Sequence, residues 1–219
     1  MVKLVDETLL MHGGRERSVA ATKTFTGQMM LFYMLAAALG RDNRALDYAR
    51  VPEFAARALE QQPAMVELVQ RYVFMENCVV VGRGLAYANA YELALKLMET
   101  CYVVAERFSS ADFLHGPVAM IERHFPGDSV CATGRNARRH QRSDSSFARV
   151  ARATRLAITA DLDAAAMCSR SVIMPREIDE FLAPIPYIIP AQLFAALLAE
   201  AKGLDPDKPR SLSKVTRTL

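Results

Sequence analysis

Three ionisable side chains recur at helical spacing between residues 85 and 100. Glu92, Lys96 and Glu99 stand at i, i+4 and i+7, which places them on one face of a helix. A carboxylate beside a lysine can take a proton and return it next to a carbonyl group, which is the step that aldose–ketose isomerisation needs. The same spacing fits a solvated helix face with ordinary ion pairs. Spacing alone favours this second interpretation.

Two further residues could do chemistry, a histidine in the middle of the chain and a lysine near its end. His115 precedes Gly116 and Pro117, so it cannot stand in the middle of a helix, and a loop histidine can carry protons near neutral pH. Residue type alone slightly favours a surface histidine that is hydrogen-bonded to nearby backbone. Lys214 lies in the polar stretch "SLSKVTRTL". A desolvated lysine can form a Schiff base with a keto sugar, whereas a solvated terminal lysine is the ordinary interpretation.

A glycine turn joins an apolar run to the helix that carries the acidic residues. The run "NCVVVGRG" fits a strand buried on both faces, as in a parallel sheet. Ligands of such sheets bind beyond the carboxyl ends of the strands, where Gly82, Arg83 and Gly84 stand. Glycines let a ligand approach the backbone, and a helix N-terminus favours anions. The third glycine of the dinucleotide fingerprint is missing, so no nucleotide cofactor is expected.

The elements that must position these residues alternate between strand and helix. Strands are predicted at 6–12, 77–84, 155–161 and 169–175, and helices at 18–40, at 85–100, at 189–204 and, broken near Pro63, within 44–73. The helix 18–40 is apolar around nearly its whole circumference after Phe25, which predicts that it lies in the core. The predicted class is α/β, a three-layer α/β/α fold with a mostly parallel sheet.

The composition narrows the class of protein. Of the 219 residues, 52% are hydrophobic and 23% charged, which is typical of globular chains. Residues 1–10 carry acids where a signal peptide has its apolar core, and no apolar run is long enough to span a bilayer, so a cytoplasmic protein with no membrane partner is expected. The four cysteines have no CxxC spacing and the four histidines form no ligand-spaced cluster, so free thiols and no metal are expected.

Several motifs occur together in a recognisable order. They are "ERSVAATKTFTGQM", "GRGLAYANAYELALKLMETCYVVAERFSSADFLHGPVAMI" and "YIIPAQLFAALLAEAKGLDPDKPRSLSKVT". The set resembles the sugar isomerase (SIS) double-domain family, which includes the isomerase region of glucosamine-6-phosphate synthase and stand-alone glucosamine-6-phosphate deaminases. The resemblance implies two SIS lobes, each a parallel sheet wrapped by helices. It also reverses the ordinary interpretations of the candidate residues.

The resemblance implies a proton shuttle and a covalent lysine. Glu99 would carry the proton between C1 and C2 of the sugar phosphate, Lys96 would lie close to the reacting carbons, and Lys214 would form the Schiff base with the open-chain ketose. His115 would help to open the sugar ring and would be donated across the interface of a homodimer. Main-chain groups of two further residues would touch the sugar, namely Val19 and Ser213.

The chain departs from the family pattern in two places. Residues 1–73 are expected to form the C-terminal part of a first SIS lobe, 74–204 a second lobe and 205–219 an active-site tail. No Ser/Thr- and Gly-rich run of the type S-x-S-G-x-T occurs, so the sugar's phosphate lacks its usual anchor and weak or no activity is expected of the chain alone. Residues 127–154 are rich in Arg, Ser and Ala instead of showing a strand and a helix.

Three explanations of residues 127–154 stay open. They are a compensated frameshift, a basic insert that contacts nucleic acid, and a solvated basic loop. The segment has one aromatic residue, Phe147, so a stacking platform for bases is poorly supported and a nucleic-acid partner is not expected. A solvated basic loop is favoured over either nucleic-acid role.

The expected function is proton-shuttle and Schiff-base chemistry on fructose 6-phosphate or glucosamine 6-phosphate in amino sugar metabolism. The alternative is a SIS domain that binds a sugar phosphate and regulates without catalysis. Retention of Glu99, His115 and Lys214 argues against the alternative, because sensing does not need this set of residues.

Overall fold

A parallel β-sheet forms the middle of the molecule. The computed structural model describes residues 4–40, 47–120, 128–132 and 154–212. Within them the sheet has five strands in the order β2-β1-β3-β4-β5, and each neighbouring pair is parallel. The strands are β1 (Asn77–Gly82), β2 (Val104–Ser109), β3 (Asp128–Ala132), β4 (Thr154–Thr159) and β5 (Arg170–Ile173). This order has its topological switch point between β1 and β3.

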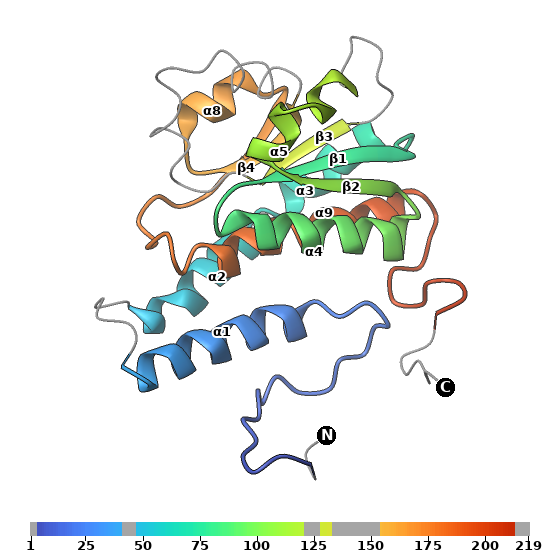
Figure 1. Ribbon diagram of the computed structural model, residues 1–219. Coiled ribbons are helices and arrows are strands. Elements are labelled where there is room, and N and C mark those ends of the chain that lie inside the picture. The colour runs from blue at the N-terminus through green and yellow to red at the C-terminus, as the bar shows by residue number, and fades with distance from the viewer. Residues whose placement is uncertain (1–3, 41–46, 121–127, 133–153, 213–219) are drawn as a thin grey trace.

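The described helices flank the sheet on both faces. The α-helices are α1 (Lys23–Ala38), α2 (Val51–Leu59), α3 (Gln62–Val69), α4 (Ala86–Cys101), α5 (Ser110–Leu114), α8 (Leu162–Met167) and α9 (Pro184–Ala201). Short 3-10 turns are η2 (Tyr48–Arg50), η3 (Gln70–Tyr72) and η4 (Pro117–Met120). α5 and α8 lie on one face of the sheet, and α4 and α9 lie on the other, with α1 as a further layer outside them (Figure 1). The predicted three-layer α/β/α class is confirmed.

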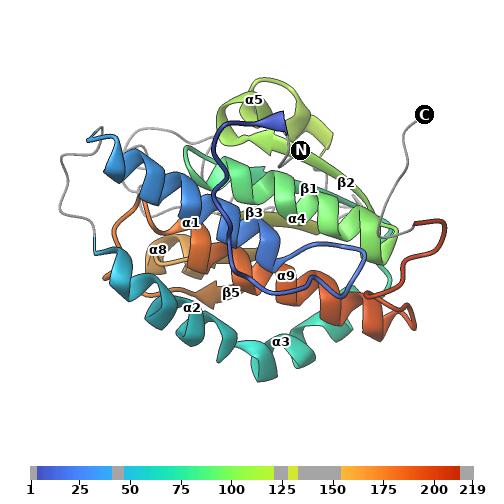
Figure 2. The ribbon, with the colours of Figure 1, turned by 90° about the horizontal axis from the view of Figure 1, so that it is seen from below.

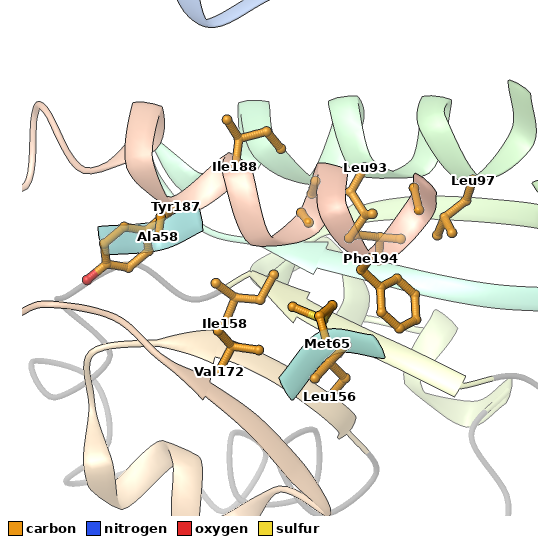
Figure 3. Packing of buried hydrophobic residues seen from close by; sticks show 14 of the residues in the cluster. Ala58, Met65, Leu93, Leu97, Leu156, Ile158, Val172, Tyr187, Ile188 and Phe194 are labelled. Carbon is orange, nitrogen blue, oxygen red and sulfur yellow. The ribbon is translucent and has the colours of Figure 1, made fainter. Parts of the chain in front are cut away.

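The main core lies between the sheet and the α4–α9 layer. α9 is apolar around its circumference, and α4, α2 and α3 all pack against it. Seen from below, α1 crosses the α4–α9 layer while α2 and α3 border it (Figure 2). In Figure 3, Phe194 of α9 lies between Leu93 and Leu97 of α4 and Leu156 of β4. The Phe194 ring also makes an edge contact with the ring of Tyr72, with 5.3 Å between centroids.

Alternate residues of β1 separate the two faces of the sheet. Cys78 and Val80 belong to the main core, whereas Val79 and Val81 pack with Phe113 of α5 on the opposite face. These four side chains are all buried, as the continuous apolar run predicted. A single buried strand therefore fixes α4 and α5 on opposite sides of the molecule.

The prediction that the first long helix lies in the core is wrong. α1 has no buried residue. The side chains that face the core are only partly covered, among them Phe25, Met29 and Tyr33. Phe32 on the outer side is 71% exposed. α1 is an outer layer that is covered by the α4–α9 layer on one side and by the N-terminal segment at Gly27, where the Met11 side chain lies. This partial cover leaves none of its residues buried, so an apolar circumference was not sufficient to bury it.

Two further predictions differ from the structure in the described residues. Residues 6–12 form no strand. β3 lies inside the segment 127–154, at the place where the family pattern has a strand, although its sequence "DSVCA" shows little apolar periodicity. β3 pairs with β1 and β4, so sheet pairing on both edges specifies this strand. The rest of that segment beyond residue 132 and up to residue 153 lies outside the described residues.

α9 has the length and mean hydropathy of a membrane span, which the sequence analysis did not detect. Its 18 residues have a mean hydropathy of 1.3. Of this stretch, 61% is buried inside the molecule against α2, α3, α4 and the sheet. α9 is thus explained as a core helix.

Candidate active site

One face of α4 carries three ionisable residues, two of them buried. Glu92 is 6% exposed and Lys96 is 4% exposed, whereas Glu99 is half-buried. Such burial of charged side chains is uncommon unless they are paired. The alternative of a solvated helix face is therefore wrong for Glu92 and Lys96.

Lys96 and Glu99 form a close ion pair. The Lys96 ammonium donates to Glu99 Oε2 over 2.5 Å, and their side chains are 5% and 28% exposed. A buried ammonium needs such a partner because it has lost its water. The Glu99 side chain stays partly exposed while the lysine holds its carboxylate in place. An accessible, oriented carboxylate can take a proton from a bound molecule and return it.

Glu92 is held by a glutamine from another helix. Gln192 of α9 donates through Nε2 to Glu92 Oε1 at 3.1 Å and to the carbonyl oxygen of Thr22 at 3.3 Å. Burial raises the pKa of the Glu92 carboxyl, and Lys96 and Gln192 oppose this only in part. Gln192 was not among the residues predicted from the sequence. The sequence carried one signal that could have identified it, because Gln192 is the one polar side chain in the apolar run "IIPAQLFAALLA".

The segment after α9 returns to the end of α4 and to the residues before α1 (Figure 1). Val19 N–H donates to the carbonyl oxygen of Asp207 at 3.1 Å, and Arg210 N–H donates to the hydroxyl of Tyr102 at 2.8 Å. Tyr102 follows Glu99 by three residues. The predicted sugar contact Val19 thus lies against the tail. Ser213 and Lys214 lie outside the described residues.

His115 lies on the other side of the sheet from the α4 residues. It follows α5 directly, and its N–H donates to the carbonyl oxygen of Asp112 at 3.2 Å. The prediction that it is not inside a helix agrees with this, although the short helix before it was not predicted. His115 is exposed, and α5 packs on the face opposite to α4. The fold does not bring His115 and Glu99 of one chain together.

The glycine turn lies at the start of α4 and Glu99 near its end. Thirteen residues separate Ala86 from Glu99, which at 1.5 Å per residue is about 20 Å of helix. A small recess of about 20 Å³ near the turn is lined by residues that include Arg83 and Asn89. The amide oxygen of Asn89 is buried there without a hydrogen-bond partner among the described residues. Gly82, Arg83 and Gly84 are not brought together with Glu99.

A larger cavity lies away from these residues. The cavity, of about 260 Å³, lies between α3 and β5. Among the described cysteines, Cys78, Cys101 and Cys168 form no disulfide, and burial raises the pKa of Cys168 to about 11. Within the described ranges, no group of three or more His, Cys, Asp or Glu side chains could hold a metal ion.

Comparison with known proteins gives clear relatives. No protein-family model matches the chain. The chain is 35% identical over 210 residues to a glutamine–fructose-6-phosphate aminotransferase (isomerizing) of Methanothermobacter thermautotrophicus, which covers 94% of this chain and 35% of the relative. The chain thus spans about a third of the length of the curated relatives it matches.

Solved structures show the same fold. The C-terminal domain of glucosamine-fructose-6-phosphate aminotransferase from Francisella tularensis matches with a TM-score of 0.80 and 26% identity, over 95% of this chain and 62% of that one. Tagatose-6-phosphate ketose/aldose isomerase from Escherichia coli matches with a TM-score of 0.72 and 23% identity, over 90% and 54%, which shows the fold alone. The chain belongs to the sugar isomerase (SIS) family and is related to the isomerase region of glutamine–fructose-6-phosphate aminotransferase.

Proposed function

We propose that the chain acts on fructose 6-phosphate or glucosamine 6-phosphate by a proton shuttle and a Schiff base. The observation that carries the proposal is the Lys96–Glu99 pair, in which a buried ammonium orients the carboxylate of a side chain that remains 28% exposed. The relationship to the aminotransferases supplies the substrate class.

The proposed chemistry moves protons and forms one reversible bond. The amine of Lys214 attacks C2 of the open-chain ketose, water leaves, and an imine forms. In aminotransfer, ammonia then replaces the lysine at this C2 imine, and the lysine amine leaves. Glu99 takes the proton from C1, the electron pair moves to give the enamine, and Glu99 returns the proton to C2. The O1 hydroxyl proton moves to the nitrogen, so the product carries an amine at C2 and an aldehyde at C1. The sequence is an internal redox exchange between C1 and C2, so it needs no external electron acceptor.

His115 would serve the site of a second copy of the chain. This is supported by its exposure and by its place on the face of the sheet opposite to Glu99. A homodimer that exchanges this side chain would bring the imidazole to the sugar ring. A cytoplasmic location would suit substrates of this kind.

The test follows product formation by the wild-type chain. Ammonia release from glucosamine 6-phosphate reports the deaminase direction, and glucose 6-phosphate formed from fructose 6-phosphate reports isomerisation. Glu99→Gln keeps the size of the side chain but cannot accept a proton, so kcat should fall at least about a hundredfold. Glu106→Gln, at an exposed position on β2, is the control and should leave kcat unchanged.

Two results would contradict the proposal. One is turnover by Glu99→Gln at the wild-type rate. The other is calorimetric binding of sugar phosphate by the wild type with no product from either substrate, which would support the regulatory alternative.

A further inference from the structure

The segment Asp205–Leu212, here called the tail segment, is fastened to the rest of the molecule at two places. The first is at Asp207. Its carboxylate accepts from the Ser18 hydroxyl at 2.5 Å, and its carbonyl oxygen accepts from Val19 N–H at 3.1 Å. A hydrogen bond to a carboxylate is stronger than one between neutral groups. The tail segment is thereby joined to the residues that precede α1.

The second fastening is at Tyr102, directly after α4. The Tyr102 hydroxyl accepts from Arg210 N–H at 2.8 Å, and the Arg210 guanidinium lies over the ring, 4.0 Å from its centroid. Pro209, between the two fastened residues, is buried. The tail segment therefore makes a polar contact and a cation–π contact with Tyr102, next to a buried proline.

Tyr102 has a backbone conformation that a bulky residue seldom adopts. Its φ is +56°, and the next residue, Val103, donates its N–H to the carbonyl oxygen of Leu97 at 3.2 Å. This is the left-handed position that ends many helices and usually holds glycine. Glycine would end α4 with less strain but would give the tail segment nothing to bind. A tyrosine at this position indicates a use for its side chain.

The tail segment also has an internal structure. The carboxylate of Asp205 accepts from the N–H groups of Asp207 and Lys208 at 2.9 and 3.2 Å. Leu212 N–H donates to the carbonyl oxygen of Pro209 at 3.4 Å. These turns fix the direction of the chain between the two fastenings.

We propose that Tyr102 is a positioning residue that anchors the tail segment beside Glu99 and so sets where Lys214 enters the site. Lys214 follows Arg210 by four residues, and an extended chain covers at most about 14 Å over that length. Tyr102 follows Glu99 by three residues, so the anchor is on the same end of α4 as the proposed proton shuttle. The consequence for Lys214 rests on the proposed function, whereas the anchor itself does not.

The anchor is tested without a substrate by limited digestion of the full chain with trypsin. Trypsin cleaves after Arg210, and mass spectrometry follows the appearance of the chain that ends there. Tyr102→Phe keeps the ring and its contact with the guanidinium but loses the hydroxyl, so cleavage should be about threefold to tenfold faster. Tyr102→Ala should be faster still. Tyr91→Phe is the control, because it removes a hydroxyl from α4 whose described hydrogen bonds are with Tyr87, at 3.4 Å, and with Arg107.

The role toward Lys214 is tested by reduction with borohydride in the presence of fructose 6-phosphate. Borohydride converts an imine on Lys214 to a stable secondary amine, whose amount is read by peptide mass spectrometry. Tyr102→Phe should lower this amount and lower kcat more than it changes KM. The positioning role would be overturned if Tyr102→Phe were cleaved faster but formed as much reduced adduct as the wild type and had the same kcat.

The two proposals fail in different ways. Cleavage after Arg210 at the wild-type rate in Tyr102→Phe and Tyr102→Ala would overturn the anchor, whatever the enzymatic activity. Faster cleavage in Tyr102→Phe, together with no adduct and no turnover in the wild type, would overturn the proposed function and support the anchor alone.

Discussion

The two buried ionisable residues of α4, Lys96 and Glu92, differ in the partners that stabilise their charges. Lys96 has a full opposite charge at 2.5 Å, whereas the hydrogen bond to Glu92 comes from the neutral amide of Gln192 at 3.1 Å. Burial without a close hydrogen-bonded cation disfavours the ionised carboxylate, and this is the main reason that the pKa of Glu92 is raised. Glu92 therefore costs stability when it ionises.

The stability of the fold should depend on the ionisation of Glu92. The folded chain holds this proton more tightly than the unfolded chain, in which the pKa is near its ordinary value of 4.5. The contribution of protonated Glu92 is thus complete below that pH and is lost as pH rises through the raised folded-state pKa. Glu92→Gln cannot ionise, so the wild type should lose free energy of unfolding relative to this variant as pH rises.

Urea unfolding at about pH 4 and about pH 7.5 measures this difference. Glu106→Gln, where the carboxyl is exposed on β2, should show no such trend relative to the wild type. A gap between wild type and Glu92→Gln that is equal at both pH values would show that the Glu92 pKa is not raised.

At the scale of the elements, the junction of β1 and α4 is packed at backbone distance. A Cβ on Gly82 would lie 2.5 Å from the carbonyl oxygen of Ala86 and 2.8 Å from the Cα of Tyr87. These atoms belong to the first turn of a long helix and cannot move away alone. Gly82 thus has a packing role, which is independent of any ligand that approaches the turn.

Gly82→Ala should destabilise the fold by about 1–3 kcal/mol, because the added methyl group overpacks the junction. Chemical denaturation measures the change in the free energy of unfolding. Gly116→Ala is the matched control, since a Cβ there meets nothing within 4 Å. Equal effects of the two substitutions would mean that α4 shifts away from β1 at little cost.

At the scale of the whole molecule, α1 presents an apolar outer face. Phe32, Leu35 and Leu39 stand at i, i+3 and i+7 and are 71%, 40% and 66% exposed. Only one charged residue, Lys23, lies within the helix. Contiguous apolar surface of this kind promotes association in water.

The chain should therefore associate with itself as its concentration rises. Sedimentation velocity over a range of concentrations measures this. Phe32→Lys places a charge in the apolar face and should weaken association about tenfold to a hundredfold. Phe74→Lys changes a phenylalanine that is 66% exposed outside α1 and should have little effect. A wild-type chain that is monomeric throughout, or equal effects of both substitutions, would contradict the expectation.

Local patterns in the sequence determined much of the fold. The apolar run before Gly82 predicted β1, and helical periodicity predicted α4 and placed Glu92, Lys96 and Glu99 on one face. These predictions hold because a strand buried on both faces and a helix each leave a repeat in the order of neighbouring residues. The motif set also identified the SIS family, which the relatives confirm.

Tertiary structure alone decided which of these residues are buried and which meet. Gln192 reaches Glu92 across 100 positions of sequence, and Arg210 reaches Tyr102 across 108. An apolar composition buries α9 but leaves α1 without a buried residue, because α9 is surrounded by α2, α3 and α4 whereas α1 lies in an outer layer. Periodicity shows that a face could be covered, but what covers it depends on segments distant in sequence.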